Sequence, residues 1–246
     1  MRFISCVNVS MVSNGINYPL ILVNLKSYSE TMGAQAEKLA EIAQKISGDT
    51  RICIGLAPQF TDIQRLNRFE IPIFSQHIDG ITPGAHTGHI LAEAVKSSGS
   101  AGTILNHSER RLLLSDIENA IKRTKEVGLI SAVCANTTGV GMAVAAFDPD
   151  IIAIEPPELI GTGVAVSKTK PEIISKSVEA IKRINKNVTV LCGAGITCGE
   201  DVFSAIKLGS SGVLVASGIV KSSNWESILK EFAEAAIKAK KDEGTK

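Results

Sequence analysis

The chain has 246 residues, of which 44% are hydrophobic and 21% are charged. That length fits one or two domains of about 100–200 residues, and a single α/β barrel commonly runs this long. The apolar content supplies a sizeable core and excludes a disordered chain. The formal net charge is +1, so there is no electrostatic reason to expect nucleic acid or an anionic membrane as a partner.

The chain carries no sequence signal for a membrane, a leader peptide or a disulfide framework. No apolar run reaches the roughly 18 residues of a transmembrane helix, and polar residues interrupt the apolar stretches of the N-terminus. The cysteines are odd in number and form no Cys-x-x-Cys pair. They are Cys6, Cys53, Cys134, Cys192 and Cys198. We therefore expect a soluble cytoplasmic protein.

Short, nearly continuous apolar runs recur along the chain and predict strands that are buried on both faces, as in parallel sheets. The runs are Leu20–Asn24, Ile52–Leu56, Ile71–Ser75, Gly102–Asn106, Ser131–Ala135, Ile151–Glu155, Val188–Cys192 and Gly212–Ala216. Segments with helical spacing of apolar residues lie between them, such as Leu39, Ile42, Ala43 and Ile46. This alternation predicts a parallel α/β fold, either an open doubly wound sheet or a closed barrel.

Helix boundaries and domain limits follow from a few local signals. Ser115 to Glu118 has the pattern of a capping box at a helix N-terminus. Four glycines stand where helices should end, namely Gly48, Gly99, Gly128 and Gly209. No linker divides the chain, so we expect one domain over residues 18–246. Residues 1–17 fit no strand or helix unit and are expected to be an N-terminal extension.

Polar residues follow five of the predicted strands at their carboxyl ends, where parallel α/β folds place their chemistry. The segments are Asn24-Leu-Lys26, Asn106-His-Ser-Glu-Arg110, Glu155-Pro-Pro, Gly193-Ala-Gly-Ile-Thr197 and Ala216-Ser-Gly218. An open sheet would not readily gather all five segments. Closing the sheet places the last strand beside the first and points them at one rim. The sequence therefore favours a single (β/α)8 barrel.

Each of these residues also has a plain structural interpretation. A lone Lys26 after a strand is usually a solvated turn residue, and His107 could simply hydrogen-bond backbone in a loop. For Glu155 the functional interpretation is favoured over the structural one, because packing alone does not account for a carboxylate at the end of an apolar run. His86-x-x-His89 lacks the glutamate and the i, i+4 spacing of a zinc motif, so no metal site is expected.

In the order and the sequences of its motifs, the chain resembles the triosephosphate isomerase family in its short archaeal form. The motifs that carry the resemblance are Asn24-Leu-Lys26, Gly84-Ala-His-Thr-Gly88, Asn106-His-Ser-Glu-Arg110, Glu155-Pro-Pro-Glu-Leu-Ile-Gly-Thr-Gly163 and Cys192-Gly-Ala-Gly-Ile196. They span the chain from about Tyr18 to the C-terminus. The chain departs from the longer form of the family after the last two strands, where Gly193-Ala-Gly-Ile replaces Gly-Gly-Ser and Ala216-Ser217 replaces Gly-Gly.

The resemblance implies interconversion of dihydroxyacetone phosphate and D-glyceraldehyde 3-phosphate through an enediolate, with no metal and no organic cofactor. Glu155 would be the base, and His107 would be a neutral imidazole electrophile at the start of a short helix. Lys26 would supply positive charge, Asn24 would orient the substrate, and Glu109 would position Lys26.

The resemblance also implies a lid at Pro156–Gly163, which would exclude water from the intermediate. Asn24 and Lys26 are expected to contact substrate. Backbone N–H groups are expected to hold its phosphate, and they belong to Ile160, Gly195, Ala216 and Ser217. The loop His77–Gly88 would reach into a neighbouring subunit, which implies a homodimer at minimum and a homotetramer made of two such dimers.

Two other functions are compatible with the barrel. One is another phosphate-binding enzyme, such as a sugar-phosphate epimerase or an aldolase that forms a Schiff base on Lys26. Glu109 as an ionic partner of Lys26 argues against the aldolase. The other is a barrel that only binds phosphorylated metabolites or a partner protein. The combination of Lys26, His107 and Glu155 argues against it, because binding alone needs no base.

Overall fold

The computed structural model describes residues 16–156, 171–193 and 195–242. The strands are β1 (Leu20–Asn24), β2 (Cys53–Ala57), β3 (Phe74–Ser75), β4 (Gly102–Leu105), β5 (Ile130–Ala135), β6 (Ile151–Ile154), β7 (Thr189–Gly193) and β8 (Gly212–Val215). The helices are α1 (Ala34–Thr50), α2 (Ile63–Leu66), α3 (Ala92–Ser97), α4 (Leu114–Val127), α5 (Thr138–Ala145), α7 (Pro171–Ile184), α8 (Gly199–Lys207), α9 (Ser217–Val220) and α10 (Trp225–Lys241). Two short 3₁₀ turns, η1 (Ser29–Thr31) and η2 (Phe60–Asp62), follow β1 and β2.

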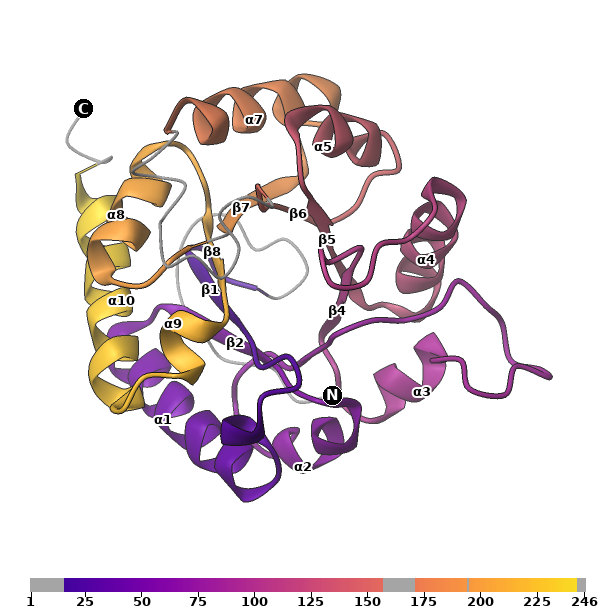
Figure 1. Cartoon of the computed structure of the whole chain (residues 1–246), viewed down its shortest axis with the longest axis horizontal. Helices are drawn as coiled ribbons and strands as arrows, with labels where there is room; N and C mark the ends of the chain where they lie inside the picture. The colour runs from indigo at the N-terminus through magenta and orange to yellow at the C-terminus, as the bar shows by residue number, and fades with distance from the viewer. Residues whose placement is uncertain (1–15, 157–170, 194, 243–246) are drawn as a thin grey trace.

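The strands form one parallel sheet that closes on itself. Its order is β2-β1-β8-β7-β6-β5-β4-β3, so the last strand pairs with the first. The remaining gap between β2 and β3 is bridged by a parallel pairing of Leu56 with Ile73, where the Leu56 N–H donates to Pro72 O at 3.0 Å. The helices surround the strands as a ring (Figure 1). The predicted (β/α)8 barrel is confirmed.

Four strands are shorter than the apolar runs predict, and β6 and β8 each lack only the last residue of their run. The run Ile71–Ser75 yields a strand only at Phe74–Ser75, because Pro72 has no N–H to donate to a sheet ladder. The run that begins at Gly102 ends as a strand at Leu105. Asn106 has a φ of 55°, which turns the chain away from the sheet and toward the barrel rim.

The barrel interior is filled by inward-facing apolar side chains, including Leu20, Leu22 and Phe74. Gly102 makes room for Phe74, since a Cβ on Gly102 would lie 2.5 Å from the Phe74 ring. Ile16 joins the same cluster and is 2% exposed. The residues between these positions face outward and pack against the helices in two further clusters. This double burial explains the continuous apolar runs of the sequence.

The predicted helix signals were right at three glycines and wrong at two sites. Gly99, Gly128 and Gly209 each follow a helix with positive φ. Gly48 lies inside α1, which continues to Thr50 and ends with Arg51 in the left-handed region. Helix α4 begins at Leu114 without a side-chain cap. Ser115 therefore lies within the first turn, two positions after the N-cap Leu113, which is too late to form the predicted capping box.

Candidate active site

The turn after β1 holds Lys26 in an uncommon backbone conformation. Its φ is 47°, a left-handed value that costs a residue with a side chain roughly 1–2 kcal/mol. The Lys26 N–H donates to the side-chain Oδ1 of Asn24 at 3.0 Å. The Lys26 ammonium lies 2.9 Å from Oε1 of Glu109, which follows β4. The turn thus brings Asn24, Lys26 and Glu109 together at the carboxyl ends of β1 and β4.

The turn after β4 presents His107 to the barrel mouth. Asn106 fixes this turn with two side-chain hydrogen bonds: its Nδ2 donates to Cys134 O at 2.9 Å, and its Oδ1 accepts from the Leu112 N–H at 3.0 Å. His107 is 8% exposed. No helix begins at His107, where the structure has a single turn closed by the Arg110 N–H on His107 O at 2.8 Å. The expected short helix is therefore wrong.

The tautomer of His107 follows from one hydrogen bond. The backbone N–H of Glu109 donates to Nδ1 of His107 at 3.2 Å, so Nδ1 acts as an acceptor and carries no proton. A neutral ring then carries its proton on Nε2, which lies 3.7 Å from Oε2 of Glu155. Besides this backbone N–H, Oε2 of Glu109 lies 3.5 Å from Nδ1 of His107.

Glu155 follows β6 and is buried, with 6% of its surface exposed. Its own N–H continues the ladder by donating to Ala135 O at 2.9 Å, which fixes the start of the side chain. Its Oε2 is buried and has no hydrogen-bond partner among the described residues. A buried carboxylate oxygen without a hydrogen-bond partner is costly for the fold. Such an atom is typical of a group that binds a ligand.

Two small neighbours shape the space around the Glu155 carboxylate. A Cβ on Gly193 would lie 2.7 Å from Glu155 Cγ, so a larger residue at the end of β7 would displace the carboxylate. Burial, then the charge of Glu155 and a hydrogen bond to its side chain, raise the pKa of the Cys134 thiol well above its usual range. Cys134 thus remains a protonated thiol beside Glu155.

The loops after β7 and β8 lie against each other. A Cβ on Gly218 would be 2.3 Å from the carbonyl oxygen of Ile196, so the two backbones are in direct contact. Gly195 has a φ of 74°, and Ala216 directly precedes Ser217, the first residue of α9. N–H groups in the first turn of a helix lack partners within that helix. The structure therefore brings the two predicted phosphate-binding segments together.

Part of the predicted site lies outside the described residues. Ile160 belongs to this part, as does the predicted lid beyond Pro156. Pro156 itself is buried directly after Glu155.

Two glutamines that were not among the predicted site residues contact the turn that carries Lys26. Gln59 follows β2 and Gln76 follows β3, and the side-chain amide of each donates to the carbonyl oxygen of Lys26. Each glutamine supplies a polar side chain just beyond a buried strand. That signal was used for five other strands and would have found both residues.

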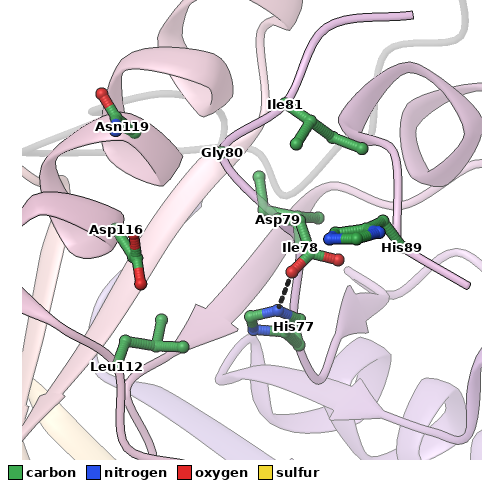
Figure 2. Close-up of a pocket in the computed structure, with 9 residues that line it drawn as sticks. All are labelled: His77, Ile78, Asp79, Gly80, Ile81, His89, Leu112, Asp116 and Asn119. Carbon is green, nitrogen blue, oxygen red and sulfur yellow. Dashed lines mark hydrogen bonds and ion pairs between the residues drawn. The ribbon is translucent and has the colours of Figure 1, made fainter. Parts of the chain in front are cut away.

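A separate pocket of about 210 Å³ opens between the β3–α3 segment and α4. Figure 2 shows His77 hydrogen-bonded to Asp79 across from Asp116, and the His77 Nε2 to Asp79 Oδ1 distance is 3.1 Å. Burial lowers the pKa of His77, although the hydrogen bond to Asp79 acts in the opposite direction. None of the residues lining this pocket is a predicted site residue, and it lies at the base of the predicted interface loop, His77–Gly88.

Two other kinds of site were sought in the described ranges. No group of three or more His, Cys, Asp or Glu side chains there is arranged to hold a metal ion. Helices long and apolar enough to cross a membrane are likewise absent from this part of the chain.

Comparisons with known proteins agree with this geometry. The family model described as triosephosphate isomerase matches residues 19–232. A triosephosphate isomerase of Methanocaldococcus jannaschii is 53% identical over 214 residues, covering 87% of this chain and 98% of that protein. Those of Methanoculleus marisnigri and Methanosarcina acetivorans are each 49% identical over 215 residues, covering 87% of this chain and 97% of each relative. The chain therefore belongs to the triosephosphate isomerase family.

Proposed function

We propose that Glu155 performs the proton transfer by which this isomerase interconverts dihydroxyacetone phosphate and D-glyceraldehyde 3-phosphate. The reaction moves one proton between adjacent carbons through an enediolate, so it needs a base over the carbon and donors at the oxygens. The observation that carries the proposal is the buried Glu155 Oε2, which lacks a partner in the described chain and lies 3.7 Å from His107 Nε2. A substrate bound over both groups would present a carbon to the base and the adjacent oxygen to the donor.

His107 and Lys26 serve the oxygen side of the reaction in this proposal. With Nδ1 occupied by the Glu109 N–H, the Nε2–H of a neutral His107 is directed at the substrate oxygens. The Lys26 ammonium supplies fixed positive charge for the developing enediolate, and its ion pair with Glu109 holds it at the rim. Asn24 both contacts substrate and supports the Lys26 turn.

The substrate phosphate is assigned to the adjoining loops after β7 and β8. Backbone N–H groups of Gly195, Ala216 and Ser217 bind it there, as barrels of this type commonly bind phosphate. Ile160, within the lid Pro156–Gly163, completes the phosphate site and the exclusion of water. The direct backbone contact between the two loops supports this assignment.

The remaining assignments concern the whole chain. Residues 18–246 form the single catalytic barrel domain, and residues 1–17 are an extension whose last part adjoins it. The enzyme acts in the cytoplasm as a homotetramer of two dimers, with a homodimer as the minimum and the loop His77–Gly88 at the dimer interface. The segment between β3 and α3 extends outward from the barrel (Figure 1), and residues 82–89 are all exposed, which suits this role.

Glu155→Gln tests the central proposal, because it keeps the size of the side chain and removes the base. We expect the isomerase rate to fall by at least ~10²–10⁴-fold, the range for loss of a general base. Affinity for 2-phosphoglycolate should change much less, since backbone groups hold the phosphate. Rates come from a coupled assay with glyceraldehyde 3-phosphate, beside melting temperatures.

The matched control is Glu41→Gln, at an exposed position of α1, which should keep the wild-type rate. Near-normal turnover of Glu155→Gln would refute the assignment of the base. A large drop in its melting temperature would make Glu155 a structural residue instead.

A further inference from the structure

The main chain of Lys26 is held on both sides by side-chain amides. Its N–H donates to Asn24 Oδ1 at 3.0 Å. Its carbonyl oxygen accepts one hydrogen bond from Gln59 Nε2 at 2.5 Å and another from Gln76 Nε2 at 2.8 Å. Both lone pairs of this carbonyl are therefore used, and the peptide group after Lys26 cannot rotate without breaking two bonds.

Each glutamine also binds a second acceptor and so connects neighbouring segments. Gln59 Nε2 donates to Ser27 Oγ at 2.8 Å. Gln76 Nε2 donates to Ala57 O, the last residue of β2, at 3.0 Å. The same Ala57 oxygen accepts the Leu25 N–H at 3.0 Å. The turn that carries Lys26 is thus tied to the ends of β2 and β3.

The conformation of Lys26 explains why such restraint matters. A residue with a side chain seldom adopts a φ of +47°, and a turn of this kind persists only when its surroundings impose it. Lys26 also carries its charge on a long flexible stem. The direction in which that stem leaves the backbone therefore decides where the ammonium can lie.

We propose that Gln59 and Gln76 are positioning residues for the isomerase reaction: together they hold the Lys26 backbone in its left-handed turn and so place the Lys26 ammonium at the substrate. Neither glutamine is assigned a contact with the reacting atoms. The proposal rests on the proposed role of Lys26 in catalysis, and it adds the ends of β2 and β3 to the parts of the barrel that serve the reaction.

Gln59→Met, Gln76→Met and the double variant remove the amide donors and approximately keep side-chain length. Misplacement of a catalytic group by about 1 Å can reduce the rate by up to ~10²-fold. We expect kcat to fall about 10-fold in each single variant and up to ~10²-fold in the double variant. Affinity for inorganic phosphate should stay within about two-fold, because the phosphate loops are not touched.

A second set of variants separates positioning from a merely structural role. The same glutamine substitutions are made in a Lys26→Met background, which removes the charge and keeps the Cβ. Positioning through Lys26 predicts no further loss of kcat/KM or of 2-phosphoglycolate affinity in that background. Equal losses in both backgrounds would overturn the proposal, as would unchanged kcat with only a lower melting temperature.

Gln64→Met is the matched control, because Gln64 is exposed on α2 between the two glutamines in the chain, and it should retain the wild-type rate. If Gln76→Met does not fold, Gln59→Met alone decides, since it removes only the bonds to Lys26 and Ser27. A wild-type enzyme without isomerase activity would refute the proposed function and this inference with it. An active wild type whose Gln59→Met variant keeps full kcat would refute this inference alone.

Discussion

The two ends of the barrel bury different kinds of polar side chain. Near the carboxyl ends of the strands the buried polar residues include Asp62, His77, His107, Glu155 and Asp201. Near the amino ends they include Ser47, Ser100, Thr189 and Ser210. Two of the hydroxyls there donate to backbone carbonyls, Ser47 Oγ to Ile52 O at 2.8 Å and Ser210 Oγ to Gly212 O at 3.1 Å, whereas Ser100 Oγ has no hydrogen-bond partner among the described residues. The titratable groups at the other end include a buried carboxylate oxygen with no hydrogen-bond partner in the described chain, and an unsatisfied buried carboxylate costs the fold more than an unsatisfied hydroxyl.

Left-handed residues with side chains also divide between the two ends. Lys26 and Asn106 lie just after strands, and Arg51 and Asp148 lie between a helix and the next strand. Arg51 ends α1 with its N–H on Ser47 O at 2.8 Å, which is an ordinary helix ending that glycine also forms. At the carboxyl end the strained residues carry side chains that make specific contacts, Lys26 with Glu109 and Asn106 with Cys134 O. Under the proposed mechanism, the same backbone strain therefore serves catalysis at one end and only reverses the chain at the other.

Lys26→Gly, in the turn after β1, should have the largest effect. Glycine adopts the positive φ without strain, so the melting temperature should hold or rise while the charge is lost. Removal of one stabilising group at a reacting oxygen costs about 10²–10³-fold in rate, and we expect a fall in kcat of at least that size. Coupled kinetics and thermal unfolding measure the two effects. A rate within a few-fold of wild type would show that the left-handed residue Lys26 has no more effect on the reaction than those at the amino end.

Asn106→Gly should lower both stability and activity. It keeps the φ of 55° but deletes the hydrogen bonds to Cys134 O and from the Leu112 N–H. Two buried hydrogen bonds are worth roughly 1–3 kcal/mol together, and the neighbouring His107 would lose its fixed direction. Urea unfolding and kcat measure this. Asp148→Gly is the control, because it deletes only exposed contacts, those to Lys125 and Asn185. Equal losses of stability and kcat in Asp148→Gly and Asn106→Gly would contradict our prediction.

His77 should make stability fall as the medium becomes acidic. Burial lowers the pKa of His77 in the folded state, despite the opposing hydrogen bond that Asp79 accepts from it, so the unfolded chain binds a proton first. This contribution is complete above the unfolded pKa of about 6.5 and is lost progressively as pH falls below it. His77→Gln should weaken the pH dependence of the free energy of unfolding, measured with urea between pH 5 and pH 8. His86→Gln, at an exposed position, should leave that pH dependence unchanged. If His77→Gln and wild type show the same pH dependence, His77 is not its source.

Arg51→Gly should have the smallest effect. Relief of a left-handed side chain of φ 60° gains about 1 kcal/mol, and the extra freedom of glycine in the unfolded chain offsets part of it. We expect stability between unchanged and about 1 kcal/mol higher, with wild-type kcat. Thermal unfolding and the coupled assay measure both, and a fall in kcat would mean that strain at the amino end also serves the reaction.

The architecture could be predicted because strands buried on both faces leave continuous apolar runs, and because polar residues follow them at one end. The errors were local. Pro72 shortened β3 by removing a donor, Gly48 did not end α1, and the Ser115 pattern did not start α4. The first is a local effect of proline, and in the two helices the observed boundary lies two or three residues from the position that the short motif indicated.

The candidate site was predictable as a set of residue types but not as a set of contacts. Lys26 and Glu109 are 83 positions apart and meet at 2.9 Å only because the sheet closes. Nδ1 of His107 accepts a hydrogen bond from a backbone N–H in a turn that was expected to be a helix. The contact of Gly193 with Glu155 involves the ends of two strands, and no pattern within either strand reveals it.

Ile16 lies ahead of β1 and yet belongs to the cluster inside the barrel. The amino-terminal end of the barrel interior is thus closed by a side chain that precedes the first strand and belongs to none. For protein engineering, a shortened or fused chain that starts at Ile16 keeps this side chain. A chain that starts at Tyr18 opens a cavity of one isoleucine, at a cost of roughly 2–5 kcal/mol.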